Sequence, residues 1–325
     1  MTEHTHALNG IRREHGYSMI ELLVSLAVLM IISGTVMDGV LRLTRTNQTV
    51  ANRSEMHAGV RNVTELLQQE IGQAGRITLP TGLTLAGSID TATLTTTGLL
   101  LNGDAGGLTA SNLVYTGEQI VIGTGDDEET VSLTNVSPAD NQITGFFLNH
   151  HDAGAPISVY GGFAQGVVPP SATDGSTGSL LKIFGDINGT GNMVYIQYEC
   201  NINEGRLYRR SMPITADKKP DLTPDLTLLN NIIANPIDPK TGQPADCFTY
   251  QEALANGDKY VVDVAVTLTV QTPSKDPVTG LFQKETKALL NVSPRNVFNV
   301  WQLAGLGITN RVQPTPPSVT ANLLP

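Results

Sequence analysis

The chain has 325 residues, of which 40% are hydrophobic and only 15% are charged, so it can bury a sizeable core and is too apolar to be disordered. Its net charge of −10 would repel a phosphate backbone, which excludes nucleic-acid binding by bulk charge. Arg206, Arg209 and Arg210 form the one candidate basic cluster in the sequence. We expect these three side chains to lie on the solvent face of a strand.

The N-terminal 16 residues are polar and carry Arg12 and Arg13 near their end, and a long apolar segment follows. Coiled as a helix at about 1.5 Å per residue, residues 19–41 span roughly 34 Å, enough to cross a hydrocarbon core of about 30 Å. A basic pair before such a segment stays in the cytoplasm, so the remainder of the chain is expected to be exported.

Gly16 and Glu21 distinguish this segment from an ordinary secretory signal. No A-x-A site follows the apolar run, whereas the small residue Gly16 precedes it, so cleavage there would leave the anchor on the mature chain. A carboxylate at Glu21 is costly in lipid and needs a partner. The α-amino group of a chain that begins at Tyr17, or that of a neighbouring subunit, can supply this partner and set the stagger between packed helices. A plain single-pass anchor with a glutamate near the headgroups is the alternative.

Residues 16–24 resemble the class III signal of type IV prepilins. The resemblance implies that the prepilin peptidase cuts after Gly16 and methylates the new N-terminal residue, Tyr17. It also implies that Glu21, the fifth residue of the mature chain, acts in assembly. The family usually has Phe where this chain has Tyr17, and its anchors commonly contain a Pro that is absent here.

An apolar stripe recurs every three or four residues from Met56 to Ala74, which is typical of an amphipathic helix. Gly72, Gly75 and Pro80 end the pattern. After the leader at residues 1–16, we therefore expect one long helix over 17–76, with its membrane anchor at about 19–41 and its second half packed on a globular head.

From residue 77 to residue 312 the patterns change to alternation and turns, which are typical of antiparallel strands. A short helix is expected at Tyr250–Ala255 and a flexible tail over 313–325. The predicted fold class is α+β and pilin-like, with a long N-terminal helix packed on an antiparallel β-rich head. The expected strands are Leu113–Ile122, Thr130–Val136, Met193–Cys200, Arg206–Met212, Tyr260–Val270 and Leu281–Val292.

Cys200 and Cys247 are the two cysteines of the chain, and both lie in the part expected to be exported. Two lone cysteines in an oxidising compartment usually form a disulfide. Two free buried thiols, or half of a metal site, are the alternatives.

The sequence contains no G-x-S-x-G, no P-loop and no CxxC, so we expect no enzymatic activity. His150, His151 and Asp152 are expected to form a solvated turn, and the acidic run 126–129 a solvated loop.

A weak calcium candidate lies at Asp186, Asn188, Thr190 and Asn192, because these residues place oxygen atoms at alternate positions. Thr190 departs from the pattern of a calcium loop, and Gln197 stands where a bidentate Glu belongs. A tight polar turn is the favoured alternative, and no other cofactor is expected.

Three short segments indicate a subgroup within this family. Residues 69–76, the hairpin over 195–210 and residues 294–296 are similar to PilW-type minor pilins, which are related to J-type pseudopilins of type II secretion. This similarity implies a minor pilin that helps to prime or cap a type IV pilus, together with other pilins and minor pilins, the prepilin peptidase and the inner-membrane assembly platform. The expected location is a single pass through the inner membrane with a periplasmic head, and then the pilus or pseudopilus at the cell surface. A type II secretion pseudopilin and a pilus-tip adhesin that binds a surface ligand through its head are the alternatives.

Overall fold

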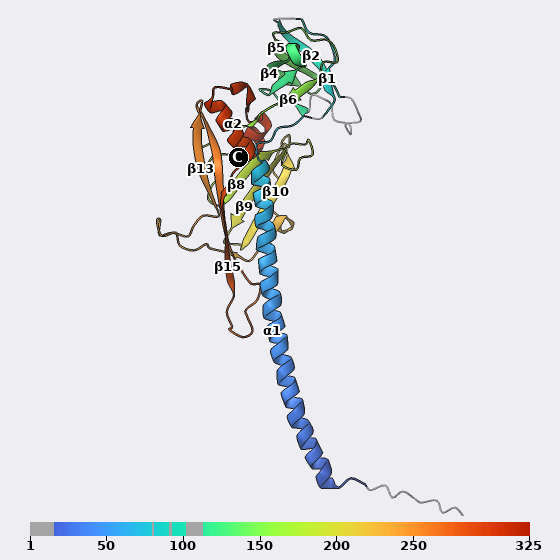
Figure 1. Ribbon diagram of the computed structural model, residues 1–325, viewed down its shortest axis with the longest axis vertical. Coiled ribbons are helices and arrows are strands. Elements are labelled where there is room, and N and C mark those ends of the chain that lie inside the picture. Colours follow the sequence, from blue (N-terminus) through green and yellow to red (C-terminus); the bar gives the residue numbers. More distant parts are fainter. Residues whose placement is uncertain (1–15, 80, 91–92, 102–112) are drawn as a thin grey trace, which may run out of the picture.

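The computed structural model describes residues 16–79, 81–90, 93–101 and 113–325, so the expected leader lies outside the described residues except for Gly16. One long helix, α1 (Met19–Gln73), runs from the N-terminal side into the head (Figure 1). Ser18 caps it, with its hydroxyl oxygen accepting the Ile20 N–H at 3.4 Å. The long N-terminal helix predicted from the sequence is confirmed.

The two halves of α1 differ in burial. Residues 16–48 are all exposed, whereas the stripe that begins at Met56 is buried in the head. Val60 is 1% exposed and Leu67 and Ile71 are fully buried, as the apolar period predicted. The helix therefore has an unpartnered first half and a second half that serves as part of the head's core.

Two antiparallel sheets enclose the second half of α1 and form the body of the head. Side chains of both sheets share one hydrophobic core with the buried stripe of the helix. The first sheet has the order β11-β10-β9-β8, and in the second, β14 pairs with β12, β13 and β15. These strands are β8 (Leu180–Gly185), β9 (Val194–Asn201), β10 (Arg206–Pro213), β11 (Thr227–Asn230), β12 (Ile232–Ile233), β13 (Phe248–Ala255), β14 (Asp258–Gln271) and β15 (Lys284–Val292).

A second unit, the distal module, lies at the end of the head away from the anchor (Figure 1). Its six-stranded antiparallel sheet has the order β1-β2-β5-β4-β3-β6 and covers a core of its own. The Leu85 N–H donates to the Ala155 carbonyl at 3.0 Å, which brings the two edges of the sheet together. The strands are β1 (Leu83–Leu85), β2 (Thr93–Leu101), β3 (Gln119–Ile122), β4 (Glu129–Ser137), β5 (Gln142–Phe147) and β6 (Ile157–Val159).

The remaining elements lie outside these two units' main sheets. Helix α2 (Arg295–Gly305) packs on β13 and β14 through Val297, Val300 and Ala304. Strands β7 (Gly162–Phe163) and β16 (Val312–Gln313) form a parallel pair. The short helical turns are η2 (Gly125–Asp127), η3 (Pro224–Leu226), η4 (Thr309–Arg311) and η5 (Val319–Leu323).

Several predicted strands are confirmed and one predicted helix is wrong. The hairpin of β9 and β10 forms as expected, and β15 returns beside β14. Residues Tyr250–Ala255, predicted as a helix, belong to β13, because their backbone pairs with β14 along most of its N-terminal half. Of the predicted strand Leu113–Ile122, only β3 is extended.

The expectation of a flexible tail over 313–325 is wrong. Gln313 is fully buried, and its side-chain amide donates to the Gln119 carbonyl of the distal module at 2.8 Å. Val319 and Leu323 are also fully buried, in a core shared with β7, β8 and β9. The tail stays in place because these apolar side chains complete that core.

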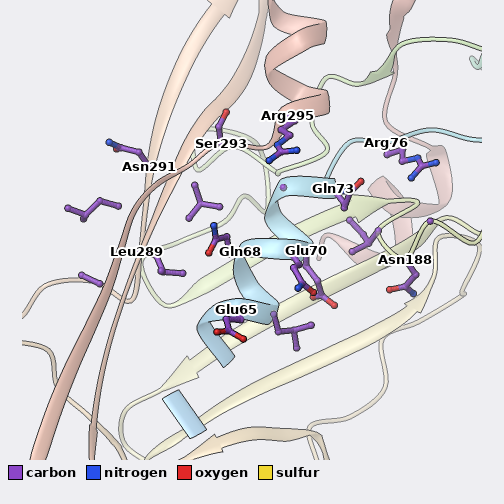
Figure 2. A pocket seen from close by; sticks show the side chains of 18 residues that line it. Glu65, Gln68, Glu70, Gln73, Arg76, Asn188, Leu289, Asn291, Ser293 and Arg295 are labelled. Atoms are coloured by element: carbon purple, nitrogen blue, oxygen red, sulfur yellow. The ribbon is translucent and has the colours of Figure 1, made fainter. Parts of the chain in front are cut away.

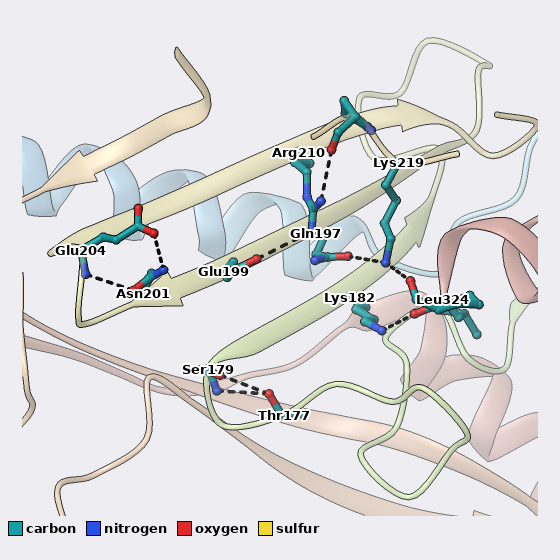
Figure 3. Close-up of polar contacts among 12 residues, drawn as sticks. Thr177, Ser179, Lys182, Gln197, Glu199, Asn201, Glu204, Arg210, Lys219 and Leu324 are labelled. Carbon is teal, nitrogen blue, oxygen red and sulfur yellow. Dashed lines mark hydrogen bonds and ion pairs between the residues drawn. The ribbon is translucent and has the colours of Figure 1, made fainter. Parts of the chain in front are cut away.

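Two lysines hold the end of this segment (Figure 3). The Lys182 Nζ donates to the Leu324 backbone oxygen at 2.5 Å, and Lys219 donates to the Pro325 backbone oxygen. Burial and the nearby charges of Lys182 and Arg210 lower the pKa of Lys219 to about 8.

Gly75 lies at the junction between the end of α1 and the rest of the head. Its φ of +81° is a conformation that side chains other than glycine rarely adopt. Its N–H donates to the Phe184 carbonyl at 2.9 Å, and its carbonyl accepts the Phe163 N–H at 2.8 Å. A Cβ atom there would lie 2.7 Å from the Val297 side chain, so this junction requires glycine.

Candidate processing and assembly site

The peptide bond between Gly16 and Tyr17 lies in exposed, non-helical backbone directly before α1. Tyr17 is 84% exposed, and a Cβ atom added at Gly16 would meet nothing within 4 Å. Regular helical hydrogen bonding begins only after Ser18, because Ser18 is extended, with φ −70° and ψ 143°. The bond is therefore open to a peptidase in the described structure.

Glu21 lies in the first turn of α1, where the partial positive charge of the helix N-terminus favours a carboxylate. Its backbone is engaged: its N–H donates to the Ser18 carbonyl at 2.9 Å, and its carbonyl accepts the Ser25 hydroxyl at 2.8 Å. Within the described residues its exposed carboxylate has no hydrogen-bond or ion-pair partner. A partner supplied by another chain would thus meet no competitor from these residues.

The first half of α1 presents apolar side chains on every face. Leu22, Leu29 and Ile31, for example, are each about 60–70% exposed. Among the described residues, α1 is the one helix that is long and apolar enough to cross a membrane, and none of that apolar stretch is buried. Water is a poor solvent for this surface, so it requires lipid or neighbouring helices.

A buried polar cluster fixes the head on the helix. The Glu70 carboxylate, 5% exposed, accepts hydrogen bonds from the Tyr198 hydroxyl and from Arg209, whose Nη2 lies 2.5 Å from Glu70 Oε1. Burial, with the Glu70 charge, raises the pKa of Tyr198, so its hydroxyl remains a donor. The cluster joins α1 to β9 and β10, so the direction of the anchor is tied to the head.

This cluster corrects the expectation that the three arginines form a solvent-facing group. Arg209 and Arg210 point to opposite faces of β10, as neighbours in a strand must. Arg209 pairs with Glu70, and the Arg210 guanidinium lies 3.7 Å from Glu199. Arg206 contacts the Tyr208 hydroxyl at 3.3 Å. Ion pairs within the head therefore occupy two of the three charges.

An open cleft of about 1130 Å³ follows the end of α1 (Figure 2). Side chains of α1 line one wall, the edge of β15 lines another, and Asn188 lies at the rim. Glu65, Arg76 and Arg295 give the cleft charges of both signs. Its lining offers hydrogen-bond donors and acceptors to a protein surface and contains no nucleophile–base pair.

The calcium candidate forms a polar turn. Asp186 is 1% exposed, and its carboxylate accepts the Thr190 and Gly191 N–H groups at 2.9 and 3.2 Å. Arg76 Nε lies 3.8 Å from the same carboxylate and supplies positive charge. Asn188, Thr190 and Asn192 point to solvent, and the described residues hold no group of three or more His, Cys, Asp or Glu suited to a metal ion. This geometry matches the tight-turn alternative.

The expected solvated turn at His150–Asp152 is solvated only in part. His150 is exposed, but His151 is buried, and its Nε2 lies 2.8 Å from Glu129 Oε1. Glu129, the last residue of the acidic run, also accepts the Leu148 N–H at 2.8 Å. The pair ties the start of β4 to the turn after β5, which is a structural role inside the distal module.

Cys200 and Cys247 form a disulfide, and both residues are buried in the core around α1. Cys200 lies in β9 of the first sheet, and Cys247 directly precedes β13 of the second. The bond therefore links the two sheets that enclose the second half of α1.

Sequence reasoning missed Glu70 and the close contacts of Gly75. Glu70 carried a usable signal, because it falls on the apolar stripe between Leu67 and Ile71. A carboxylate at a core position requires a buried partner. Nothing local identified that partner, because Tyr198 and Arg209 are 128 and 139 residues away in the chain.

Comparison with known families gives one match. Residues 11–37 match the family model described as the prokaryotic N-terminal methylation motif. This range covers the exposed Gly16–Tyr17 bond, Glu21 and most of the apolar anchor. Comparisons with curated proteins and with solved structures gave no match.

Proposed function

Because its N-terminal motif makes the chain a type IV prepilin-like protein, we propose that it is a minor pilin of the PilW type, which enters a type IV pilus through α1 and helps to prime or cap the filament. Subunits with this motif are structural and are not enzymes. The observation that carries the proposal is the exposed apolar first half of α1, which begins within the matched motif and packs against none of the described residues.

Processing comes first in this proposal. The prepilin peptidase removes residues 1–16 by cutting after Gly16 and then methylates the amine of Tyr17. The exposed, non-helical backbone at this bond supports the step, because its peptide group is not held in helical hydrogen bonds. The start of α1 at Met19 leaves this bond free while the anchor is folded.

Assembly then uses the charge of Glu21. The new amine at Tyr17 lies four residues before Glu21, within reach in the same helix or in a neighbouring one. An amine–carboxylate pair in an apolar filament core is stronger than in water, because the surrounding dielectric is low. Such a pair favours one stagger between adjacent helices and disfavours the others.

The proposed location rests on the same features. The anchor crosses the inner membrane once, the head lies in the periplasm, and the assembly platform transfers the subunit to the pilus at the cell surface. The disulfide between Cys200 and Cys247 supports an oxidising compartment for the head.

The mass of the N-terminal peptide after co-expression with an active prepilin peptidase tests the processing step. We expect a peptide that begins at methylated Tyr17. A Gly16→Val variant, which blocks cleavage without touching any folded neighbour, should retain the leader. A wild-type peptide that begins at Met1, with the peptidase active on a control prepilin, would overturn the proposal.

Filament incorporation of Glu21→Ala tests the assembly step, with Glu55→Ala as the matched control. Both carboxylates are exposed on α1, and only Glu21 lies within the motif. Glu21→Ala should remove the subunit from sheared filaments while the melting temperature of the head stays unchanged. Equal incorporation of the two variants would contradict a role for Glu21.

A pilus-tip adhesin is the second candidate, and the distal module favours it. This unit has its own core at the end of the head away from the membrane. Leu94 and Phe146 are paired across β2 and β5, and both expose apolar side chains, at 65% and 52%. An adhesin would lose surface binding in a Phe146→Ser variant that keeps normal filament numbers, whereas a priming subunit would not.

A type II secretion pseudopilin is the third candidate. Loss of secretion in a deletion strain that keeps its pili would identify it.

A further inference from the structure

The connection between β14 and β15, residues 272–283, runs along α1 toward the membrane anchor (Figure 1). Four side-chain contacts join this hairpin to the helix, and successive contacts toward its tip reach helix positions closer to the anchor. They pair Glu285 with His57, Gln283 with Arg53, Ser274 with Asn52 at 2.8 Å, and Asp276 with Thr49. The tip therefore points at the membrane end of the head.

Asp276 makes the tip a defined turn. Its carboxylate accepts the Val278 and Thr279 N–H groups at 2.7 and 3.1 Å. Its backbone N–H donates to the Leu281 carbonyl at 2.9 Å. These hydrogen bonds hold the backbone of the turn that carries the side chains beyond Asp276.

These side chains are apolar and exposed. Val278 is 72% exposed, Leu281 69% and Phe282 38%. The Lys275 ammonium lies 5.8 Å from the centre of the Phe282 ring. Apolar side chains beside a lysine, exposed at the end of a fixed turn, suit the boundary between acyl chains and charged headgroups.

The depth of the tip agrees with that environment. Thr49, which Asp276 contacts, lies eight residues past Leu41, where the expected anchor ends, or about 12 Å along the helix. Beyond Asp276 the hairpin continues toward the anchor before it turns back (Figure 1). The headgroup layer on each side of a bilayer is roughly 5–7 Å thick. Arg45 and Arg53 add positive charge to the same stretch of α1.

We propose that the hairpin tip, Lys275 to Phe282, inserts into the headgroup region of the anionic bilayer that α1 spans and forms a second membrane contact of the unassembled subunit. The tip and the anchor together hold the head at one height and tilt above the membrane. The proposal rests on α1 being a membrane anchor and is independent of cleavage after Gly16. Extraction of the subunit into a filament would have to break this contact.

Environment-sensitive labelling of the full chain in vesicles tests the proposal. Because Cys200 and Cys247 are paired, a single introduced cysteine carries the label. Val278→Cys reports the tip, and Leu254→Cys is its control, since it is 69% exposed and pairs with Lys259 at the opposite end of β14. Val36→Cys reports the anchor. The probe is a nitrobenzoxadiazole fluorophore in vesicles of phosphatidylglycerol and phosphatidylcholine, with lipid quenchers in the headgroup region or the acyl chains.

We expect the label at residue 278 to shift its emission to the blue and to be quenched several-fold more by headgroup quenchers than the label at residue 254. Adding Lys275→Glu should reduce this difference in anionic vesicles and leave it unchanged in neutral ones. If residue 278 behaves like residue 254 while residue 36 is quenched from the acyl chains, the inference fails and the anchor stands. If residue 36 is not quenched, the anchor itself is refuted. Protection of residue 278 that rises with protein density at fixed lipid would refute lipid contact and assign the tip to a neighbouring subunit.

Discussion

The two halves of α1 have opposite environments within one continuous helix. The first half exposes every residue from 19 to 48, and the second half contributes Val60, Leu67 and Ile71 to a core enclosed by two sheets. Helical hydrogen bonds are satisfied internally in both halves, so the helix itself does not require either environment. What differs is the solvent that each surface needs: protein for the second half, and lipid or other helices for the first.

From this difference we expect the stability of the head to depend on the second half of α1, and the proposed assembly to depend on the first. Substitutions in the first half should leave the folding of the head unchanged, and substitutions in the second half should act on folding. Unfolding of full-chain variants in detergent tests that separation.

Leu67→Ala should cause the largest loss. Leu67 is fully buried between the two sheets, and removing its side chain leaves a cavity, which lowers the free energy of unfolding by about 4–5 kcal/mol. Leu23→Ala, at a position that is 59% exposed, is the matched control and should leave the head unchanged. Urea denaturation followed by circular dichroism measures both. Equal losses in the two variants would show that the halves are not separate.

Removing the disulfide should lower stability by slightly less. The bond between Cys200 and Cys247 closes a segment with a sequence separation of 47, for which chain entropy predicts about 3–4 kcal/mol. The double variant Cys200→Ser and Cys247→Ser, and the reduced wild type, should unfold at the same urea concentration. If reductant still destabilised the double variant, the loss would have a source other than this bond.

Gly75→Ala and Gly72→Ala should change stability in opposite directions. A Cβ atom at Gly75 meets Val297 at 2.7 Å and requires a φ of +81°, which should destabilise the head by about 1–3 kcal/mol. Gly72 is helical and a Cβ atom there meets nothing within 4 Å, so alanine should stabilise by about 0.5–1 kcal/mol. A loss of stability in both variants would show that the end of the helix requires glycine generally, and that the requirement is not specific to the junction at Gly75.

The sequence predicted those features whose signals are local. The N-terminal methylation motif, the apolar stripe of α1 and the alternation of β14 each lie in one short stretch. By contrast, Tyr250–Ala255 has residues that favour a helix, and its pairing with β14 overrode that preference.

Contacts between distant residues could not be predicted in the same way. The composition of the Pro-bearing segment 313–325 indicates a flexible tail. In the structure, however, Gln313 contacts the distal module, and Leu323 packs in the same core as Phe184. The partners of Glu70 in the head are likewise set by tertiary packing. In the candidate site, the motif was therefore predictable, whereas the cluster that ties its helix to the head was not.

The last prediction concerns the distal module, whose described core contains no residue of α1. Glu118 is fully buried beside it. One carboxylate oxygen accepts the Tyr115 N–H at 3.0 Å, and the other has no hydrogen-bond partner among the described residues. Burial raises the pKa of this group from about 4.5 to about 8, so it is neutral at pH 7 in the folded protein.

Between these two values the unfolded chain releases a proton that the folded chain keeps, so stability should fall as pH rises from 4.5 to 8. The Glu118 contribution is fully present below pH 4.5 and lost above pH 8. From pH 6 to pH 7 it amounts to at most about 1.4 kcal/mol. Glu118→Gln should remove this slope, whereas the exposed control Glu128→Gln should keep it; an unchanged slope in Glu118→Gln would refute the assignment. The single tryptophan, Trp301, lies in α2, which packs on β13 and β14, so its fluorescence reports the body. If the free energy of unfolding measured by Trp301 fluorescence shows the Glu118-dependent pH slope, the distal module and the body unfold together. If only circular dichroism shows this slope, the distal module unfolds separately from the body.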